Sequence, residues 1–262
     1  MWKQSTMEGK QYKKLSIIIP IFNERKTISA ILTAIREVEL PIEKELIIVD
    51  DCSTDGSREI LEALNNRGNG SPVDNRLAMS VIHRVVLLDK NQGKGAAVRR
   101  GFGEATGDIV LIQDADLEYN PADYSALINP IIDGAADVVY GSRFLKSETS
   151  KQNKIIYRHG YFASRILNWF SNILSGVRLS DMYTCYKVFS KEAIDRIHPR
   201  LTSKRFGVDP ELTAWAAKFE LRVVEVPISY IGRTYEEGKK INWKDGLAAV
   251  WHIIKFNIFT RK

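Results

Sequence analysis

The sequence has little cysteine and no long apolar run, and both shortages exclude whole classes of protein. Its 262 residues include only two cysteines, Cys52 and Cys185, which leaves no disulfide framework and no cysteine-bound metal cluster. The longest apolar runs, such as Ile17 to Phe22, have the length of a strand, whereas a membrane-spanning helix needs roughly 18 to 20 apolar residues. Residues 1–14 are polar and show no secretory signal. We therefore expect a reduced, cytoplasmic chain, and 44% hydrophobic with 27% charged residues is typical of a globular one.

The net charge of +6 is unevenly distributed along the chain. Residues 1–141 contain 16 Lys and Arg against 21 Asp and Glu, for a net charge of −5, and residues 142–262 contain 22 against 11, for +11. The basic half could face nucleic acid, an anionic membrane or a phosphorylated substrate. Its basic residues form no recognition helix and no RNA-binding motif, so we expect no nucleic-acid partner.

The order of apolar segments indicates an α/β protein. Strand patterns occur at residues 15–21, 45–50, 84–88, 109–113 and 137–140, and helical patterns alternate with the first four. This alternation predicts a mostly parallel sheet flanked by helices, with right-handed crossovers. The second half has helical patterns at 155–174, 208–219 and 242–259 and strand patterns at 184–189 and 222–231. No linker separates the halves, so we expect one domain, 1–262, with a tail at 1–14 and regions at 15–141 and 142–262.

Polar or charged residues follow each of the five strands predicted in the first half. These segments are residues 20–24, 50–56, 91–95, 114–118 and 141–143. A single polar turn is ordinary. In open α/β sheets, however, ligands bind beyond the carboxyl ends of the strands, and five such segments together indicate a binding site.

The pair Asp114 and Asp116 is the strongest candidate for chemistry. In an extended segment, residues two apart point the same way, so both carboxylates could meet one cation together with Glu118. Mg²⁺ and Mn²⁺ prefer oxygen ligands and often bridge substrate phosphates. The alternative is a turn whose aspartates cap the helix that Pro121 could begin.

Two other phosphate-binding patterns fail on spacing. Gly232 and the pair Gly238-Lys239 are one residue too far apart for a P-loop, and no strand, loop and helix surround them. The glycines between residues 93 and 103 do not form a dinucleotide-binding pattern after the first strand. A P-loop NTPase or a dehydrogenase is therefore unsupported.

Taken in order, the motifs resemble a known family. PIFNE, IIVDDCSTDGS, NQGKGAAVRRG, DADLE and GSRF are similar to those of inverting family-two glycosyltransferases of the GT-A fold. DMYTCYKVF, RFGVDPELTA and VPISYIGRTYEEGKKI resemble dolichyl- and polyprenyl-phosphate sugar synthases. The resemblance covers about residues 15–245. It implies transfer of mannose or glucose from GDP-mannose or UDP-glucose to a polyprenyl phosphate at the cytosolic membrane face, with 15–141 serving the nucleotide sugar and metal, and 142–262 the acceptor and membrane.

The resemblance also implies roles for particular residues. The nucleotide sugar would contact Pro20, Phe22, Glu24, Val49, Asp51, Lys94, Asp114, Ala115 and Asp116. Mg²⁺ or Mn²⁺ would be held by Asp114, Asp116 and Glu118. The catalytic set would be Asp116, Asp181 and three residues that bind phosphates: Arg143, Arg233 and Lys239. The chain departs from the family at Phe22, where Tyr is usual, and at Thr184-Cys185-Tyr186, where Thr-Gly-Phe is usual.

Two amphipathic helices could bring the protein to a membrane. The apolar stripe in residues 242–259 consists of Trp243, Leu247, Val250, Trp251, Ile254 and Ile258, with Lys244, Lys255, Arg261 and Lys262 beside it. The stripe in 155–174 consists of Phe162, Ile166, Trp169, Phe170 and Ile173, with Arg158 and Arg165 nearby. Aromatic and basic residues are typical of interfacial helices, whereas burial against the sheet is the alternative. We expect peripheral membrane association, and the resemblance to a branch without spanning helices raises a separate membrane subunit as a partner.

Two other functions remain open. A family-two transferase could act on a non-lipid acceptor, with Asp209 or Glu211 as the base that such an acceptor needs. A non-catalytic subunit that binds nucleotide sugars is the other, although the intact Asp114 and Asp116 favour an enzyme.

Overall fold

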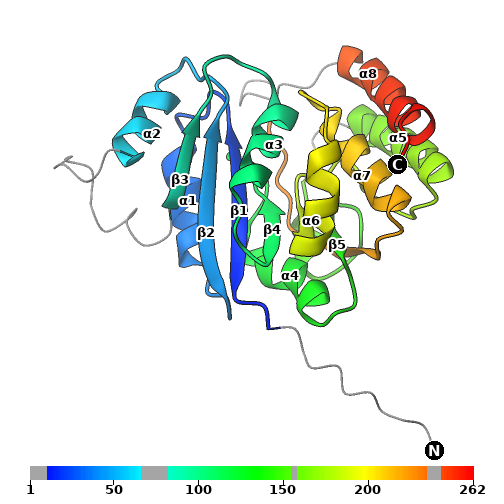
Figure 1. Cartoon of the computed structure of the whole chain (residues 1–262), viewed down its shortest axis with the longest axis horizontal. Coiled ribbons are helices and arrows are strands. Elements are labelled where there is room, and N and C mark those ends of the chain that lie inside the picture. The colour runs from blue at the N-terminus through cyan, green and yellow to red at the C-terminus, as the bar shows by residue number, and fades with distance from the viewer. Residues whose placement is uncertain (1–10, 66–81, 155–157, 235–242) are drawn as a thin grey trace, which may run out of the picture.

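A seven-stranded sheet runs through the centre of the protein (Figure 1). The computed structural model describes residues 11–65, 82–154, 158–234 and 243–262. The strand order is β3-β2-β1-β4-β6-β5-β7. The strands are β1 (Lys14–Ile21), β2 (Glu43–Asp50), β3 (Ile82–Leu87), β4 (Ile109–Ile112), β5 (Val138–Ser142), β6 (Lys187–Ser190) and β7 (Val223–Pro227).

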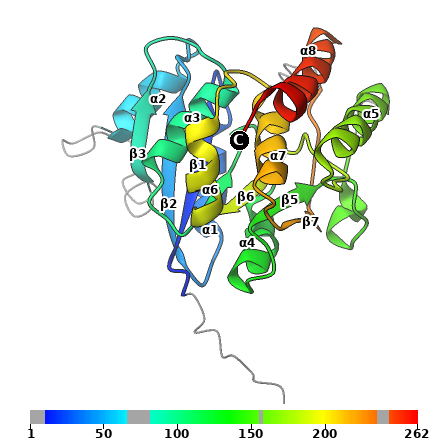
Figure 2. The ribbon, with the colours of Figure 1, turned by 45° about the vertical axis from the view of Figure 1, so that its right-hand side comes forward.

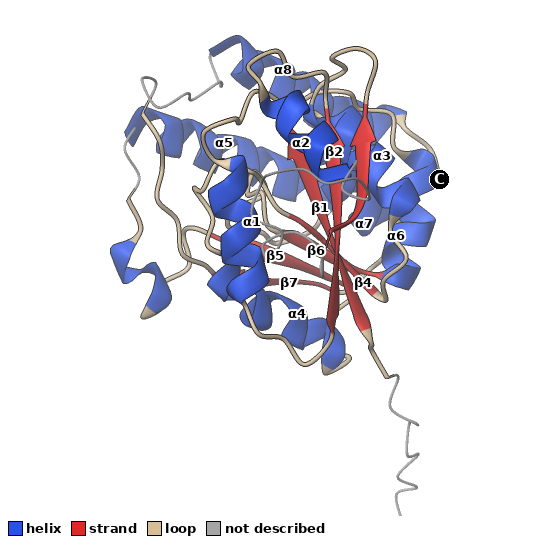
Figure 3. Cartoon of the chain, turned by 90° about the vertical axis from the view of Figure 1, so that its left-hand side faces the viewer, coloured by secondary structure: helices blue, strands red, loops and turns tan. Residues whose placement is uncertain are grey.

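Helices cover both faces of this sheet, which explains its apolar strands. The α-helices are α1 (Ile28–Glu37), α2 (Ser57–Asn65), α3 (Lys94–Glu104), α4 (Tyr124–Ile132), α5 (Arg158–Ser175), α6 (Lys191–Ile197), α7 (Val208–Lys218) and α8 (Trp243–Ile254). Figure 3 shows α1 on one face, with α3 and α6 on the other. All four residues of β4 are buried, as expected for a strand covered on both sides. No helix in the described ranges is long and apolar enough to cross a bilayer.

The predicted mostly parallel α/β sheet is confirmed, with one exception that the sequence pattern does not reveal. β1 pairs in parallel with β2 and β4, and β2 pairs in parallel with β3. β6 lies between β4 and β5 and is antiparallel to both. An apolar strand pattern carries no information on direction, so this inserted strand could not be recognised from composition.

Several element boundaries differ from the sequence-based prediction. The strand expected at 184–189 is shorter and starts at Lys187, and the one expected at 222–231 ends at Pro227. The helix expected to reach residue 259 ends at Ile254 and continues as a π-helical turn, Lys255–Phe259. The pattern does not predict α6, and it offers the helix that follows Pro121, observed as a 3-10 turn and α4, only as an alternative.

Gly101 allows α3 to lie directly on the sheet. A Cβ atom at this position would stand 2.3 Å from Cγ2 of Ile18 in β1, which is far inside van der Waals contact. Any larger residue would push the helix away from the strand. Close packing against the sheet thus requires glycine at this position of the helix.

A buried carboxylate joins the amino ends of the central strands. Glu45 in β2 is 3% exposed and accepts hydrogen bonds from the hydroxyl of Ser16, from the amide (2.7 Å) and hydroxyl (2.6 Å) of Thr106, and from the amide of Gly107 (3.1 Å). Burial raises the pKa of Glu45, but the hydrogen bonds from Ser16 and Thr106, with the charge of Lys14, outweigh burial and hold it below its usual value.

We expect Glu45→Gln to lower the free energy of unfolding by about 1–3 kcal/mol at neutral pH, because its amide NH₂ would face donors. The pKa is lower in the folded state, so the carboxylate stabilises the fold above the unfolded pKa, and this contribution is lost as the pH falls through the folded pKa. Urea titrations of both proteins from pH 7 down to pH about 3 should show the difference shrinking in acid. Glu43→Gln, at an exposed position of the same strand, is the matched control, and equal losses in the two variants would contradict this role.

Candidate active site

The carboxyl ends of β1, β2 and β4 meet at one edge of the sheet. Ile21 at the end of β1 is in register with Asp50 at the end of β2, and β4 runs parallel beside β1. The segments 20–24, 50–56 and 114–118 therefore converge there, as the sequence predicts. This edge lies at the end of the molecule that also carries α5 and α8 (Figures 1 and 2).

Asp51 fixes the turn that leads into α3. Its carboxylate oxygens accept hydrogen bonds from the amides of Gln92 (2.7 Å) and Gly93 (2.6 Å). Burial raises the pKa of Asp51, and these two hydrogen bonds partly offset that effect. Gly93 has a φ of 92°, and a Cβ there would stand 2.6 Å from the carbonyl oxygen of Lys204, so only glycine fits. This turn places Lys94 at the start of the helix, facing the end of β4.

Lys94 forms an ion pair with the first aspartate of the Asp-x-Asp segment. Its ammonium lies 2.7 Å from Oδ2 of Asp114. The backbone amide of Asp114 donates to Sγ of Cys185, at 3.1 Å. Burial raises the pKa of Asp114, but the charge and the hydrogen bond of Lys94 outweigh it, so the net pKa is lowered. Asp114 is therefore held as a carboxylate beside a cation.

Arg233 links the second aspartate to two glutamates. Its guanidinium nitrogens lie 2.8 Å from Asp116 Oδ2, 3.3 Å from Glu118 Oε1 and 3.4 Å from Glu24 Oε2. Burial, together with the charges of Asp114 and Glu118, raises the pKa of Asp116 to about 7, although the charge of Arg233 lowers it. Three carboxylates from two segments, residues 20–24 and 114–118, thus share one cation.

Tyr230 joins this cluster to a second ion pair. Its hydroxyl donates to Oε2 of Glu118 at 2.8 Å, and its ring lies 5.1 Å from the guanidinium carbon of Arg143. The amide of Ile231 donates to the carbonyl of Glu118 at 3.0 Å. These contacts hold the segment before Arg233 against the Asp-x-Asp turn.

Arg143 and Asp181, both predicted catalytic residues, pair with each other. Nε and Nη2 of Arg143 donate to the two carboxylate oxygens of Asp181 at 2.7 Å each, and Asp181 is fully buried. Glu225 accepts from the amides of Ser180 (2.7 Å) and Asp181 (2.9 Å), which fixes the backbone at this aspartate. Burial lowers the pKa of Arg143, but the charge of Asp181 outweighs burial and raises it well above its usual value. This bidentate pair anchors the end of β5 beside the site.

Other predicted site residues are placed less directly. The side chains of Val49 and Ala115 are buried in the core, so the nucleoside and diphosphate contacts expected of them stay predictions. Pro20 and Phe22 are half-buried at the end of β1. Lys239 lies outside the described residues.

The two carboxylates considered as alternative bases are engaged in structural contacts. Asp209 pairs with the buried ammonium of Lys187 at 2.5 Å. Glu211 is fully buried and accepts hydrogen bonds from the amides of Thr202 and Ser203 at 2.8 Å each. Asp209 therefore joins α7 to β6, and Glu211 joins α7 to the segment before it.

Sequence reasoning did not single out three residues that shape the site. Glu225 contacts the predicted Asp181 from within the second-half strand pattern, and Tyr230 lies in the VPISYIGRTYEEGKKI motif, which gives it no role of its own. Cys185 was noticed only as a departure from the family pattern, and it supports the backbone of Asp114. These contacts join residues that are far apart in the sequence, so the spacing of neighbouring residues does not indicate them.

The donor atoms suit a hard divalent cation that a substrate helps to bind. Among the residues the structure describes, no three Asp, Glu, His or Cys side chains are arranged to hold a metal by themselves. Mg²⁺ is usually held by one or two carboxylates together with substrate phosphates. Asp116 and Glu118 supply such oxygens, and both pair with the guanidinium of Arg233 in this structure. Their chemistry therefore fits a divalent cation, and the identity of its ligands stays a prediction.

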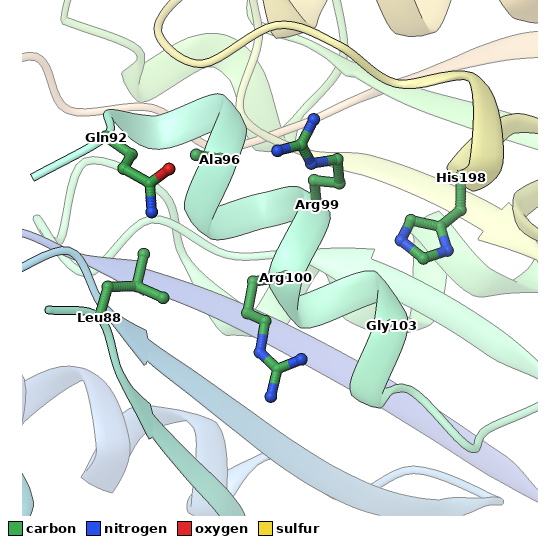
Figure 4. A pocket seen from close by; sticks show the side chains of 7 residues that line it. All are labelled: Leu88, Gln92, Ala96, Arg99, Arg100, Gly103 and His198. Atoms are coloured by element: carbon green, nitrogen blue, oxygen red, sulfur yellow. The ribbon is translucent and has the colours of Figure 1, made fainter. Parts of the chain in front are cut away.

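A separate cavity of about 300 Å³ runs along α3 (Figure 4). It is lined by Leu88, Gln92, Ala96, Arg99, Arg100, Gly103 and His198. Arg99 donates to the carbonyl of Leu201, and Arg100 pairs with Glu104, so its two arginines have partners. The cavity contains no residue of the Asp-x-Asp cluster, and we assign it no function.

The fold is that of known nucleotide-sugar enzymes. Glucosyl-3-phosphoglycerate synthase from Mycobacterium tuberculosis, solved with Mn²⁺, UDP and glucosyl-3-phosphoglycerate, superposes with a TM-score of 0.64 at 18% identity. The match covers 94% of this chain and 80% of that one. The expected GT-A-like fold is therefore confirmed.

Sequence relatives point in the same direction. UDP-N-acetylglucosamine–dolichyl-phosphate N-acetylglucosaminyltransferase from Methanococcus voltae is 27% identical, over 92% of this chain and 95% of that protein. Undecaprenyl-phosphate 4-deoxy-4-formamido-L-arabinose transferase from Photorhabdus laumondii is 29% identical over 89% of this chain, which spans 65% of that relative's length. Residues 16–197 match the family model described as glycosyl transferase family 2, more than half of the sequence. The chain therefore belongs to glycosyl transferase family 2.

Proposed function

We propose that this protein transfers a sugar from a nucleotide sugar to a polyprenyl or dolichyl phosphate. The observation that carries the proposal is the cluster at the carboxyl edge of the sheet, where Asp114, Asp116 and Glu118 face Lys94 and Arg233. Such a cluster can hold a divalent cation and the diphosphate of a donor. The acceptor class is supported by the names of the Methanococcus and Photorhabdus relatives, which act on lipid phosphates.

The site suits displacement of a nucleoside diphosphate. Asp116 and Glu118, and Asp114 once released by Lys94, would hold Mg²⁺ or Mn²⁺, which when bound neutralises charge on the leaving diphosphate. The guanidinium of Arg233 can grip phosphate oxygens with two parallel hydrogen bonds. Because a phosphate acceptor is already an anion at neutral pH, it needs positioning more than a general base. We propose a single inverting displacement.

The donor is the finer part of the proposal. We propose a hexose, mannose or glucose, from GDP-mannose or UDP-glucose, whereas the Methanococcus relative is named for N-acetylglucosamine and the Photorhabdus relative for an arabinose derivative. A thermal-shift panel of GDP, UDP, GDP-mannose, UDP-glucose and UDP-N-acetylglucosamine, each with Mn²⁺, Mg²⁺ or EDTA, separates these donors. A ligand at a hundredfold excess over its Kd stabilises the fold by about 2.7 kcal/mol.

We expect a metal-dependent shift with nucleotides of one base and a larger shift with one of its sugars. A shift for no nucleotide, in folded protein, would contradict the proposed donor site. Shifts without any sugar transfer would favour a non-catalytic subunit that binds nucleotide sugars.

The membrane surface is the second part of the proposal. Helices α5 and α8 lie side by side at the same end of the molecule as the site (Figures 1 and 2). Their exposed apolar residues are Phe162, Ile166, Trp169 and Ile173 on α5, Leu247, Val250 and Trp251 on α8, and Ile258 and Phe259 beyond it. Trp169 is 64% and Trp251 is 56% exposed, so these side chains are not buried against the sheet. Phe170 and Ile254, predicted in the same stripes, are half-buried, and Phe170 packs against the core. The side chains of Arg158, Trp243 and Lys244 lie outside the described part.

We propose that these two helices rest in the interface of a membrane that contains the lipid acceptor. Aromatic side chains favour the headgroup region, and nearby basic groups such as Lys255, Arg261 and Lys262 favour anionic lipid. The protein would act peripherally, from the cytoplasmic side. The separate membrane subunit suggested by the resemblance remains part of the proposal.

Trp251→Glu should weaken binding to vesicles of mixed phosphatidylcholine and phosphatidylglycerol by roughly tenfold, because a charged side chain would replace an aromatic ring that inserts into the membrane interface. Co-sedimentation measures this loss. Ala30→Glu on α1 adds the same charge at an exposed position on another helix and should leave binding unchanged. Equal binding by the wild type and Trp251→Glu would rule out α8 as the contact.

A further inference from the structure

The Arg233 side chain lies where a cation would be expected to bind the acidic cluster. Each of its guanidinium nitrogens faces a different carboxylate: Nη2 faces Asp116, Nε faces Glu118 and Nη1 faces Glu24. Arg233 is only 18% exposed at its side chain, so water screens these contacts weakly. The guanidinium therefore already neutralises much of the charge that would attract a metal ion.

A divalent cation and this guanidinium would compete for the same oxygens. Oδ2 of Asp116 lies 2.8 Å from Arg233, and a metal bound to that oxygen would bring two positive groups within a few ångströms of each other. Like charges at such a distance repel strongly in a partly buried site. One cation has to leave before the other can use these carboxylates fully.

The backbone beside Arg233 is held by a bond that uses neither the guanidinium nor a carboxylate, because the amide of Ile231 donates to the carbonyl of Glu118 at 3.0 Å. The amide of Arg233 itself donates to Glu118 Oε1 at 3.1 Å, the oxygen that its Nε also faces. The side chain can thus exchange partners while its Cα atom stays beside the cluster. A diphosphate is a suitable new partner, because its oxygens accept the same paired hydrogen bonds as a carboxylate.

We propose that Arg233 is the resident counter-ion of the metal-free site and that it is displaced when metal and diphosphate bind together. The carboxylates would then coordinate the metal, and the guanidinium would bind the diphosphate instead of the carboxylates. Without nucleotide, the metal would bind weakly, because the displaced guanidinium would have no anion to pair with. This inference rests on the proposed function, since it assigns an order of binding at the same site.

The test is Mn²⁺ binding, measured by electron paramagnetic resonance of the free ion with and without UDP or GDP. Without nucleotide, Arg233→Gln should bind Mn²⁺ about tenfold more tightly than the wild type, because it removes the competing charge. Adding the accepted nucleoside diphosphate should tighten Mn²⁺ binding strongly in the wild type and much less in Arg233→Gln. Arg233→Lys keeps the charge but cannot face three carboxylates, so its Mn²⁺ affinity should lie between those of the wild type and Arg233→Gln.

Arg84→Gln controls for the change in net charge, because Arg84 pairs with Glu104 near the other end of α3. It should bind Mn²⁺ like the wild type. Equal or weaker Mn²⁺ binding by folded Arg233→Gln would overturn the inference, while nucleotide-dependent Mn²⁺ binding in the wild type would still support the donor site. If no form binds Mn²⁺ even with nucleotide, the metal site and the inference both fail.

Discussion

Asp116→Asn should lower the turnover of sugar transfer by at least about a hundredfold, because it removes a negative ligand from the site where the leaving diphosphate is stabilised. The change preserves the shape of the side chain and keeps an acceptor oxygen for the amide of Glu118, which lies 3.1 Å from Oδ1. The loss should therefore appear in kcat rather than in stability. Release of nucleoside diphosphate, measured with saturating donor and lipid acceptor, gives kcat directly.

Asp133→Asn is the matched control for this substitution. Asp133 is exposed at the end of α4, so the same loss of one carboxylate there should leave kcat unchanged. The melting temperatures of both variants should stay near that of the wild type. A kcat within a few fold of wild type for Asp116→Asn would remove Asp116 from the catalytic machinery.

Arg143→Met should destabilise the protein by about 3–5 kcal/mol, because it leaves the fully buried carboxylate of Asp181 without its cation. Among the described residues, the bond from the amide of residue 143, at 3.1 Å, is the one that this carboxylate would keep. Chemical denaturation at neutral pH measures the loss. Arg143→Lys should lose less, because a lysine keeps the charge but not the two parallel hydrogen bonds.

The double variant Arg143→Met/Asp181→Leu separates the structural and catalytic roles of this pair. Removing both charges should restore much of the stability lost in Arg143→Met, since no uncompensated charge remains buried. If Arg143 also binds phosphate, as the family resemblance predicts, the double variant will be folded but deficient in turnover. Wild-type kcat in the stable double variant would limit Arg143 and Asp181 to a structural role.

Much of the fold could be predicted from local patterns. The apolar strands at residues 15–21, 45–50 and 109–113 occur within one or two residues of their expected limits, because burial on both faces requires continuous apolar runs. The clustering of polar segments at one edge followed from parallel pairing alone. The family followed from the motifs, and the match over residues 16–197 confirms it.

The pairings within the site could not be predicted in the same way. Nothing local indicates that Arg143 meets Asp181 or that Arg233 spans three carboxylates, since these contacts join residues far apart in the chain. The direction of β6 decides where residues 181–186 lie, and an apolar strand pattern does not encode it. The exposure of the stripes on α5 and α8 also needed the structure, because an amphipathic pattern fits burial and membrane contact equally well.

The central claim is transfer of a sugar to a lipid phosphate, and one assay tests it most directly. Purified protein is incubated with radiolabelled UDP-glucose, GDP-mannose or UDP-N-acetylglucosamine, polyprenyl phosphate in detergent or vesicles, and Mn²⁺ or Mg²⁺. We predict that one donor gives a labelled lipid, that EDTA or Asp116→Asn abolishes it, and that nucleoside diphosphate is released in equal amount. Binding of a nucleotide sugar without any labelled lipid, across these donors and both undecaprenyl and dolichyl phosphate, would contradict the account.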